Sequence, residues 1–83
     1  MALTSDEVLA GLAEIIAEEV TVDAAAVSAD QNLLSDLDID SLSRLTIATQ
    51  AEDQFKVTIP DEEINKFVTV GDLADYIVNA QKL

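Results

Sequence analysis

The chain has 83 residues, with 17 acidic and 4 basic side chains, a formal net charge of −13, and no histidine or cysteine. It therefore cannot itself provide a thiolate, an imidazole base, a disulfide or a zinc site made of cysteine and histidine. We expect one small, soluble, cytoplasmic domain spanning residues 1–83 that binds basic proteins, and neither nucleic acid nor membrane, because its surface repels phosphates and no leader or membrane-spanning run is evident.

The first predicted element is an amphipathic helix from Ser5 to Glu19. Its apolar side chains recur at helical spacing and fall within one arc of the helix. They are Val8, Leu9, Leu12, Ile15 and Ile16. Thr4 stands three residues before Glu7, which is the spacing of a capping box, so the helix should begin near Ser5.

Residues 20–40 lack a helical stripe and predict a long loop. The apolar residues in it recur often enough to hold the loop on a core, and a long packed loop is more often functional than disordered. These predicted anchors are Val22, Val27, Leu33, Leu34 and Leu37. The loop leads directly to Ser41.

A second helix is predicted from Ser41 to Phe55, with Asp40 as its cap. It has two apolar faces, one with Ile47, Ala48, Ala51 and Phe55 and the other with Leu42, Leu45 and Thr49. One face suffices for a core. The other, flanked by Thr46, Glu52 and Asp53, is either a docking surface or a set of ordinary solvated leucines.

Two further helices complete the predicted fold. Residues 57–60 form a short extended connection, and the acids after Pro60 suit the positive end of a short helix, from which Ile64 and Phe67 face inward. Thr69 and Asp72 repeat the capping-box spacing, and a helical stripe continues to about Ala80. Its members are Val70, Leu73, Ala74 and Ile77. The fold class is therefore all-α, a four-helix bundle with three longer helices, one short helix and a long packed loop between the first two.

The densest polar segment, residues 36–42, superficially resembles a calcium loop. If Asp36 were the first ligand, the required glycine would fall at Ser41 and the bidentate glutamate at Ile47, so the segment fails the pattern. We predict no specific metal site, and loose binding of divalent ions to the clustered charge is the remaining alternative. Acid–base catalysis by the paired carboxylates is also disfavoured, because nothing is evident that would raise the pKa of one and keep the other low.

Ser41 follows a capping aspartate at the mouth of the long loop. A serine in the first turn of a helix is common and needs no function. A catalytic nucleophile needs a neighbouring base, and none of the lysines is near Ser41 in sequence. We therefore interpret Ser41 as a site that another enzyme modifies, since a phosphodiester there would sit beside the free N–H groups of the helix start.

Four short motifs are distributed along the chain, at residues 36–43 (DLDIDSLS), 52–55 (EDQF), 59–63 (IPDEE) and 69–72 (TVGD), the last followed by Tyr76 and Ile77. With these motifs the whole chain resembles the acyl carrier protein family, particularly the freestanding fatty-acid carriers of actinobacterial type. The resemblance implies that Ser41 is esterified by 4′-phosphopantetheine from coenzyme A, whose terminal thiol carries acyl groups as thioesters. The protein would then be a carrier and not an enzyme.

The resemblance also implies partners and contact residues. We expect a monomer that meets a phosphopantetheinyl transferase and fatty-acid-synthesis enzymes with basic docking patches, namely malonyl transferase, ketosynthase, reductases and dehydratase. The expected docking residues are Asp40, Leu42, Leu45, Glu52 and Asp53. The expected wall of an acyl-chain shelter is Leu33, Ile47, Ala51, Ile59, Ile64 and Leu73, which ordinary core packing would require equally.

Two departures from the family pattern bear on docking. Many members have a glycine where this chain has Asp38, although aspartate is usual in the actinobacterial type. Many members also have an acidic residue where this chain has Thr46. Arg44, the only arginine, interrupts the acidic surface, and its stem should lie across the bundle edge with its head in water. The nearest rival function is a carrier of a polyketide, peptide or specialised lipid pathway, and a remote rival is an unmodified acidic adaptor.

Overall fold

The computed structural model describes residues 3–81, and that part is all-helical apart from one isolated bridge between Asn32 and Thr69. The elements are α1 (Ser5–Val20), the 3₁₀ helix η1 (Ala24–Ala26), α2 (Ser41–Phe55), α3 (Asp61–Ile64) and α4 (Val70–Ala80). This confirms the predicted four-helix class with one short helix. Every helix within residues 3–81 is too short or too polar to span a lipid bilayer.

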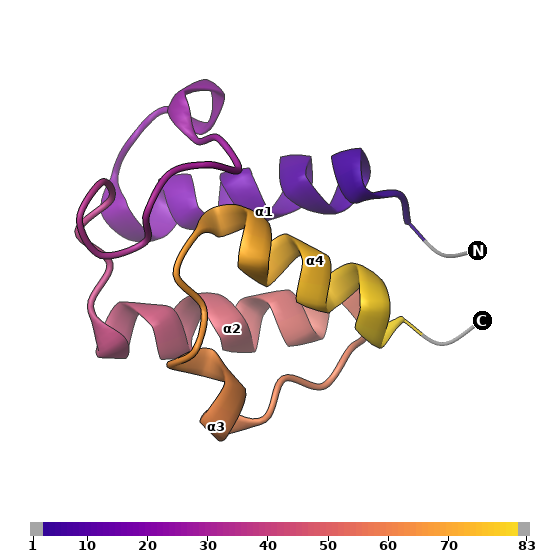
Figure 1. Ribbon diagram of the computed structural model, residues 1–83. Coiled ribbons are helices and arrows are strands. Elements are labelled where there is room, and N and C mark those ends of the chain that lie inside the picture. Colours follow the sequence, from indigo (N-terminus) through magenta and orange to yellow (C-terminus); the bar gives the residue numbers. More distant parts are fainter. Residues whose placement is uncertain (1–2, 82–83) are drawn as a thin grey trace.

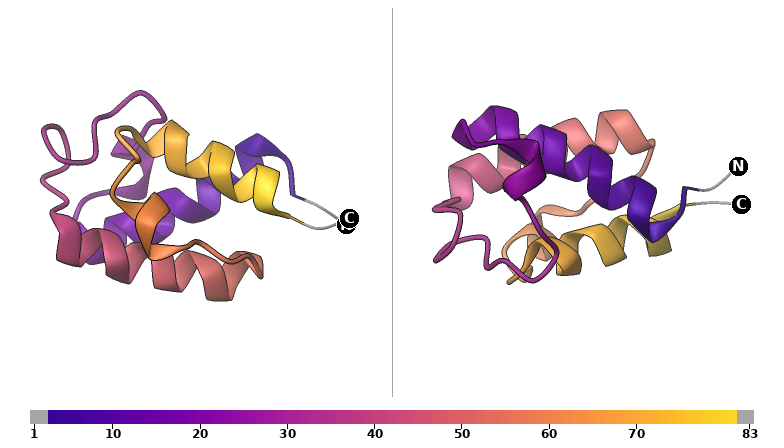
Figure 2. Two further views of the ribbon diagram at one scale, coloured as in Figure 1. Left: turned by 60° about the horizontal axis from the view of Figure 1, so that its bottom comes forward. Right: turned by 90° about the horizontal axis from the view of Figure 1, so that it is seen from above.

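The long helices lie side by side, and α1 packs against both α2 and α4 (Figure 1). The short α3 rests against α2, and the second set of views shows it beside the middle of α2 (Figure 2). The long loop gathers at the end of the bundle where α2 begins. The two ends of the described chain lie together at the opposite end of the bundle.

The predicted caps are present at three helix starts. Thr4 and Glu7 form a reciprocal capping box, in which each side chain accepts from the backbone N–H of the other. Thr69 and Asp72 do the same at α4. At α2, the Asp40 carboxylate accepts from the Ser43 N–H at 2.9 Å. Because each cap satisfies orphan N–H groups, these helices begin where the sequence predicts.

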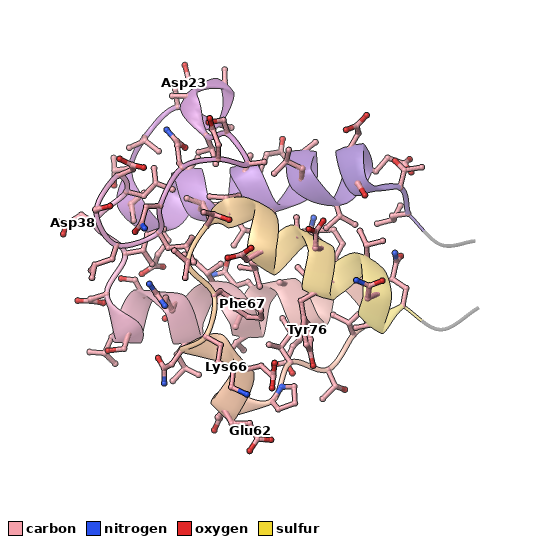
Figure 3. All side chains as sticks on the ribbon, viewed as in Figure 1. Asp23, Asp38, Glu62, Lys66, Phe67 and Tyr76 are labelled. Atoms are coloured by element: carbon pink, nitrogen blue, oxygen red, sulfur yellow. The ribbon has the colours of Figure 1, made fainter. Side chains whose placement is uncertain are left out.

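The apolar faces of all four helices meet in one hydrophobic cluster. The predicted stripe of α4 is fully inside it, and the predicted arc of α1 is inside except for half-buried Leu9. Ile64 and Phe67 face inward as expected, and the Phe67 ring meets the Tyr76 ring edge-on at 5.4 Å (Figure 3). The core is therefore built mainly of aliphatic side chains, with Phe55 on α2 and an aromatic pair beside α4.

The long loop is packed, but not by all the residues predicted to anchor it. Leu33 is buried, and Val27 and Leu37 pack partly against the core. Val22 and Leu34, in contrast, are 40% and 56% exposed, so their assignment as anchors was wrong. Ile39, which was not among the predicted anchors, is fully buried. Burial in an irregular loop depends on contacts that no local period encodes, so helical spacing could not identify it.

The loop is held on the start of α4 by main-chain hydrogen bonds. Leu33 donates to Val68, and Val70 and Gly71 donate to Gln31 and Ala29. The Gly71 N–H lies 2.8 Å from the Ala29 oxygen, and a Cβ at this glycine would lie 3.0 Å from the same oxygen. The close approach therefore favours glycine here and fixes the path of the chain into α2.

Candidate functional site around Ser41

Ser41 is the first residue of α2, and its side chain is exposed. The cap at Asp40 defines its position, because the chain arrives extended at Asp40 and turns helical at the serine. No hydrogen bond ties the Ser41 hydroxyl to another group among residues 3–81. The hydroxyl is thus presented at the bundle end that also carries the long loop, where a second enzyme can reach it.

The first turn of α2 can receive an anion. Asp40 occupies the Ser43 N–H through its carboxylate and the Arg44 N–H through its carbonyl, at 2.9 Å each. Within residues 3–81 the N–H groups of Ser41 and Leu42 have no acceptor. These two donors and the positive end of the helix dipole suit a phosphodiester on the serine oxygen.

Two surface hollows meet at Ser41. One, of about 290 Å³, is lined by Leu34, Ile39, Asp40, Ser41, Arg44 and Asn65. The other, of about 190 Å³, is lined by Ser41, Leu45, Asp61, Ile64 and Asn65. Ser41 and Asn65 therefore stand where the two hollows adjoin, one at the start of α2 and the other just after α3. A flexible group on Ser41 has a groove on either side in which to lie.

The predicted docking residues on α2 are brought to one exposed face, with one exception. Leu42 and Leu45 are 76% and 45% exposed, and Asp53 is exposed further along the helix. Glu52 is half-buried instead, and its carboxylate accepts from the Ile59 N–H at 2.8 Å. Its charge therefore also holds the connection between α2 and α3 in place.

The six predicted shelter residues, Leu33, Ile47, Ala51, Ile59, Ile64 and Leu73, are all buried in the one core cluster. Ile64 also lines the smaller hollow beside Ser41. The apolar interior therefore adjoins the serine through α3. Whether these residues enclose an acyl chain remains a prediction.

Several residues near Ser41 escaped sequence analysis. Asn65 follows α3 and is distant from Ser41 in sequence, whereas Leu34 and Ile39 lie in the irregular loop just before α2, where no helical period indicates which side chains face the serine. Arg44 was placed on the core-facing side of the helix, but its head is not simply in water, because Nη1 donates to the Phe67 carbonyl at 2.9 Å. In the sequence, the only sign that Arg44 lies near Ser41 is that the two residues are three positions apart, about one turn of a helix.

Chemically, this site presents a hydroxyl and lacks the means to activate it. The chain has no histidine or cysteine, and no group of three or more acidic side chains in residues 3–81 is arranged to hold a metal ion. A serine without a neighbouring base is a poor nucleophile. The arrangement can be modified by another protein but provides no catalytic machinery of its own.

Comparison with known proteins gives the same result. A family model described as "Phosphopantetheine attachment site" matches residues 10–77. An acyl carrier protein of Beutenbergia cavernae is 56% identical, over 98% of this chain and 99% of its own length. An acyl carrier protein of Myxococcus xanthus is 49% identical, over 93% of this chain and 98% of its own length. The solved structure of the acyl carrier protein of Enterococcus faecalis matches with a TM-score of 0.78 at 37% identity, covering 95% of this chain and all of that one.

The chain therefore belongs to the acyl carrier protein family. The similar curated proteins are mostly actinobacterial, which confirms the predicted resemblance. Members of this family are carriers and not enzymes, and their prosthetic group is 4′-phosphopantetheine. The open first turn of α2 and the hollows beside Ser41 fit such a group.

Proposed function

We propose that Ser41 carries the 4′-phosphopantetheine arm and that the protein delivers acyl groups, held as thioesters on the thiol of this arm, to the enzymes of fatty-acid synthesis. The observation that carries the proposal is an exposed, unbonded serine hydroxyl beside free helix N–H donors in a phosphopantetheine family. The single domain, residues 1–83, would work as a cytoplasmic monomer.

Attachment requires a phosphopantetheinyl transferase. The Ser41 oxygen forms a bond to the phosphorus of coenzyme A that bears the pantetheine arm, and the bond from that phosphorus to the bridging oxygen breaks, releasing 3′,5′-ADP. The serine proton leaves to a base of the transferase. This chain contributes the helix start, which donates to the phosphodiester, and Asp40, which holds the first turn in place.

Docking would use the exposed face of α2. Leu42 and Leu45 supply apolar contacts, and Asp40 and Asp53 face basic patches on malonyl transferase, ketosynthase, reductases and dehydratase, with Glu52 adding charge despite its bond to Ile59. An exposed charge pair contributes only about 0.2–1 kcal/mol, so several must act together and the complexes should be transient and sensitive to salt. Transient binding suits a carrier that must leave each enzyme.

The attachment is tested by incubation with coenzyme A, Mg²⁺ and a broad-specificity transferase, followed by intact-protein mass spectrometry. We expect the mass of one phosphopantetheine to be added to the wild type and to the Ser43→Ala variant, and none to be added to Ser41→Ala. Addition that survives Ser41→Ala would place the arm elsewhere and overturn the proposal.

The pathway is tested separately with the arm attached. We expect malonyl transferase and ketosynthase of fatty-acid synthesis to load the holo protein. Preferential loading by an adenylating enzyme or a polyketide ketosynthase would contradict the fatty-acid assignment while leaving the carrier role intact.

A further inference from the structure

Arg44 is the only basic residue in the first 55 positions of a chain with net charge −13. Its side chain is half-buried and lines the larger hollow together with Ser41. In residues 3–81 no carboxylate oxygen lies within 4 Å of its nitrogen atoms, and the single ion pair there joins Lys66 and Glu63 at 3.2 Å. The positive charge of Arg44 therefore has no acidic partner in an otherwise acidic neighbourhood.

The Arg44 guanidinium is anchored on one side only. Nη1 donates to the Phe67 carbonyl at 2.9 Å, which fixes the head against the segment before α4. A guanidinium has five N–H donors in a planar fork, so most of them remain for another acceptor. Anchoring also lowers the entropy that would be lost when a second group binds.

Arg44 can reach a group carried by Ser41. Residues three apart on a helix are neighbours, with Cβ atoms about 5–6 Å apart, and helical side chains lean back toward the N-terminus. Arg44 and Ser41 line the same hollow, so a group carried by the serine oxygen would share that hollow with the Arg44 side chain. A phosphodiester on that oxygen would be an anion within reach of an unpaired cation.

We propose that Arg44 is a positioning residue for the prosthetic arm: its free N–H groups bind the phosphodiester on Ser41 and hold the arm in the hollow that Ile39 and Asn65 line. The proposal rests on the proposed attachment at Ser41. The first part of the arm then lies along the protein between α2 and the residue after α3, and a partner enzyme must lift it out before using the thiol.

The test compares apo and holo protein, both labelled with ¹⁵N, in the wild type and in Arg44→Met. We expect attachment to shift the amide signals of Ile39 and Asn65 in the wild type, and these holo-minus-apo shifts to be smaller in Arg44→Met, by up to about 5-fold, because the loss of one ion pair lowers the docked-to-free ratio of the arm by at most about that factor. Lys66→Met is the matched control, because it removes the same charge from a residue that lines neither hollow. Its shifts should equal those of the wild type.

Arg44→Met also loses the hydrogen bond to the Phe67 carbonyl, which could loosen the fold. The holo and apo forms of the same variant are therefore compared with each other, and two further measurements are added. Arg44→Lys keeps the charge and should retain shifts between those of the wild type and Arg44→Met. In the wild type, raising NaCl from about 0.02 M to about 0.5 M should reduce the shifts, because salt screens an exposed pair.

The role of Arg44 would be overturned if the holo-minus-apo shifts were equal in the wild type and Arg44→Met, or if Lys66→Met reduced them as much as Arg44→Met does. Shifts in the wild type that do not change with salt would also overturn it. If Arg44→Met does not fold, the salt dependence of the wild type and the Arg44→Lys shifts decide the question. An absence of mass gain at Ser41 would instead overturn the proposed attachment, so the two failures are distinguishable.

Discussion

Asp38 is held in a left-handed backbone conformation, with φ of 55°, two residues before the cap of α2. Its side chain points away from the bundle at the edge of the loop (Figure 3). An L-residue in this region is strained, although aspartate tolerates it better than most, and glycine adopts it freely. This geometry favours glycine or aspartate over other residues at position 38.

We predict that Asp38→Gly raises the free energy of unfolding by about 0.5–1 kcal/mol, because the relief of backbone strain exceeds the extra chain entropy of glycine. Chemical denaturation measures this. Asp38→Ala separates the two effects of the change, since it removes the charge and keeps the strain. If alanine stabilises the fold as much as glycine does, the strain argument is wrong.

Asp72 gives the stability a dependence on pH. The N–H groups of Thr69 and then Val68 donate to its carboxylate, and with the Thr69 hydroxyl they hold the pKa of Asp72 below its ordinary value of 3.8. A group whose pKa is lower in the folded state stabilises the fold above its unfolded pKa. That stabilisation is lost as the pH falls through the folded pKa.

We therefore predict that Asp72→Asn is less stable than the wild type at neutral pH and that the difference shrinks as the pH falls below about 4. Urea unfolding at a series of pH values measures the difference, and comparing the two proteins cancels the titration of the other acids. A difference that is the same at neutral and acidic pH would show that charge at this cap does not matter.

At the scale of whole elements, the sequence predicts the helices well and the long loop poorly. The bounds of α2 match the prediction, and α1 runs one residue further, to Val20. Caps and helical stripes depend on residues a few positions apart, so the sequence alone predicts them. The short helix η1, the exposure of Leu34 and the burial of Ile39 depend on how the loop meets α4, and nothing local encodes that.

Contact between α1 and α2 is close at Gly11, where a Cβ would lie 2.8 Å from Gln54 Nε2 and 2.9 Å from Phe55 Cζ. Alanine gains about 1 kcal/mol over glycine in a helix, whereas overpacking costs about 1–3 kcal/mol. The Phe55 ring is buried and cannot swing away freely. We expect Gly11→Ala to lose about 1 kcal/mol of stability in chemical denaturation.

This contact is tested by making the same Gly11→Ala substitution in a second protein that already carries Phe55→Leu. In Phe55→Leu the smaller side chain leaves room, so adding Gly11→Ala there should be neutral or stabilising. An equal loss in both backgrounds would locate the cost elsewhere.

At the scale of the whole molecule, the net charge of −13 is carried by a body with a radius of gyration of 11.4 Å and a longest extent of 33 Å. The Debye length is about 10 Å at 0.1 M salt and about 30 Å at 0.01 M, so at low salt most acids repel each other across the entire bundle. The first 43 residues hold ten acids and no basic residue. Self-repulsion should therefore destabilise the fold.

We predict that added NaCl or Mg²⁺ raises the melting temperature, measured by circular dichroism. The variant Glu18→Gln with Glu19→Gln should melt higher at low salt and respond less to salt, because it removes two acids from the negative end of α1. A melting temperature that is flat or falls with salt in the wild type would contradict this prediction.

The site was only partly predictable from the sequence, because some of its residues are brought together by the tertiary fold and not by local spacing. Ser41, its cap at Asp40 and the exposed leucines lie on one helix, and local spacing reveals them. Asn65 and the Phe67 carbonyl come from beyond α3 and reach the site only through the tertiary fold. The bond between Glu52 and Ile59 is likewise invisible to a helical wheel.

The two ends of the described chain are hydrogen-bonded to each other, with Leu3 and Gln81 exchanging bonds of 2.8 and 3.0 Å, on the side of the bundle away from Ser41. An incoming and an outgoing tether would thus leave from a single spot. The fold could be spliced into a surface loop of a host protein, or immobilised on a bead, with its serine still pointing outward. Its architecture is as well suited to a passenger within a longer polypeptide as to independent diffusion.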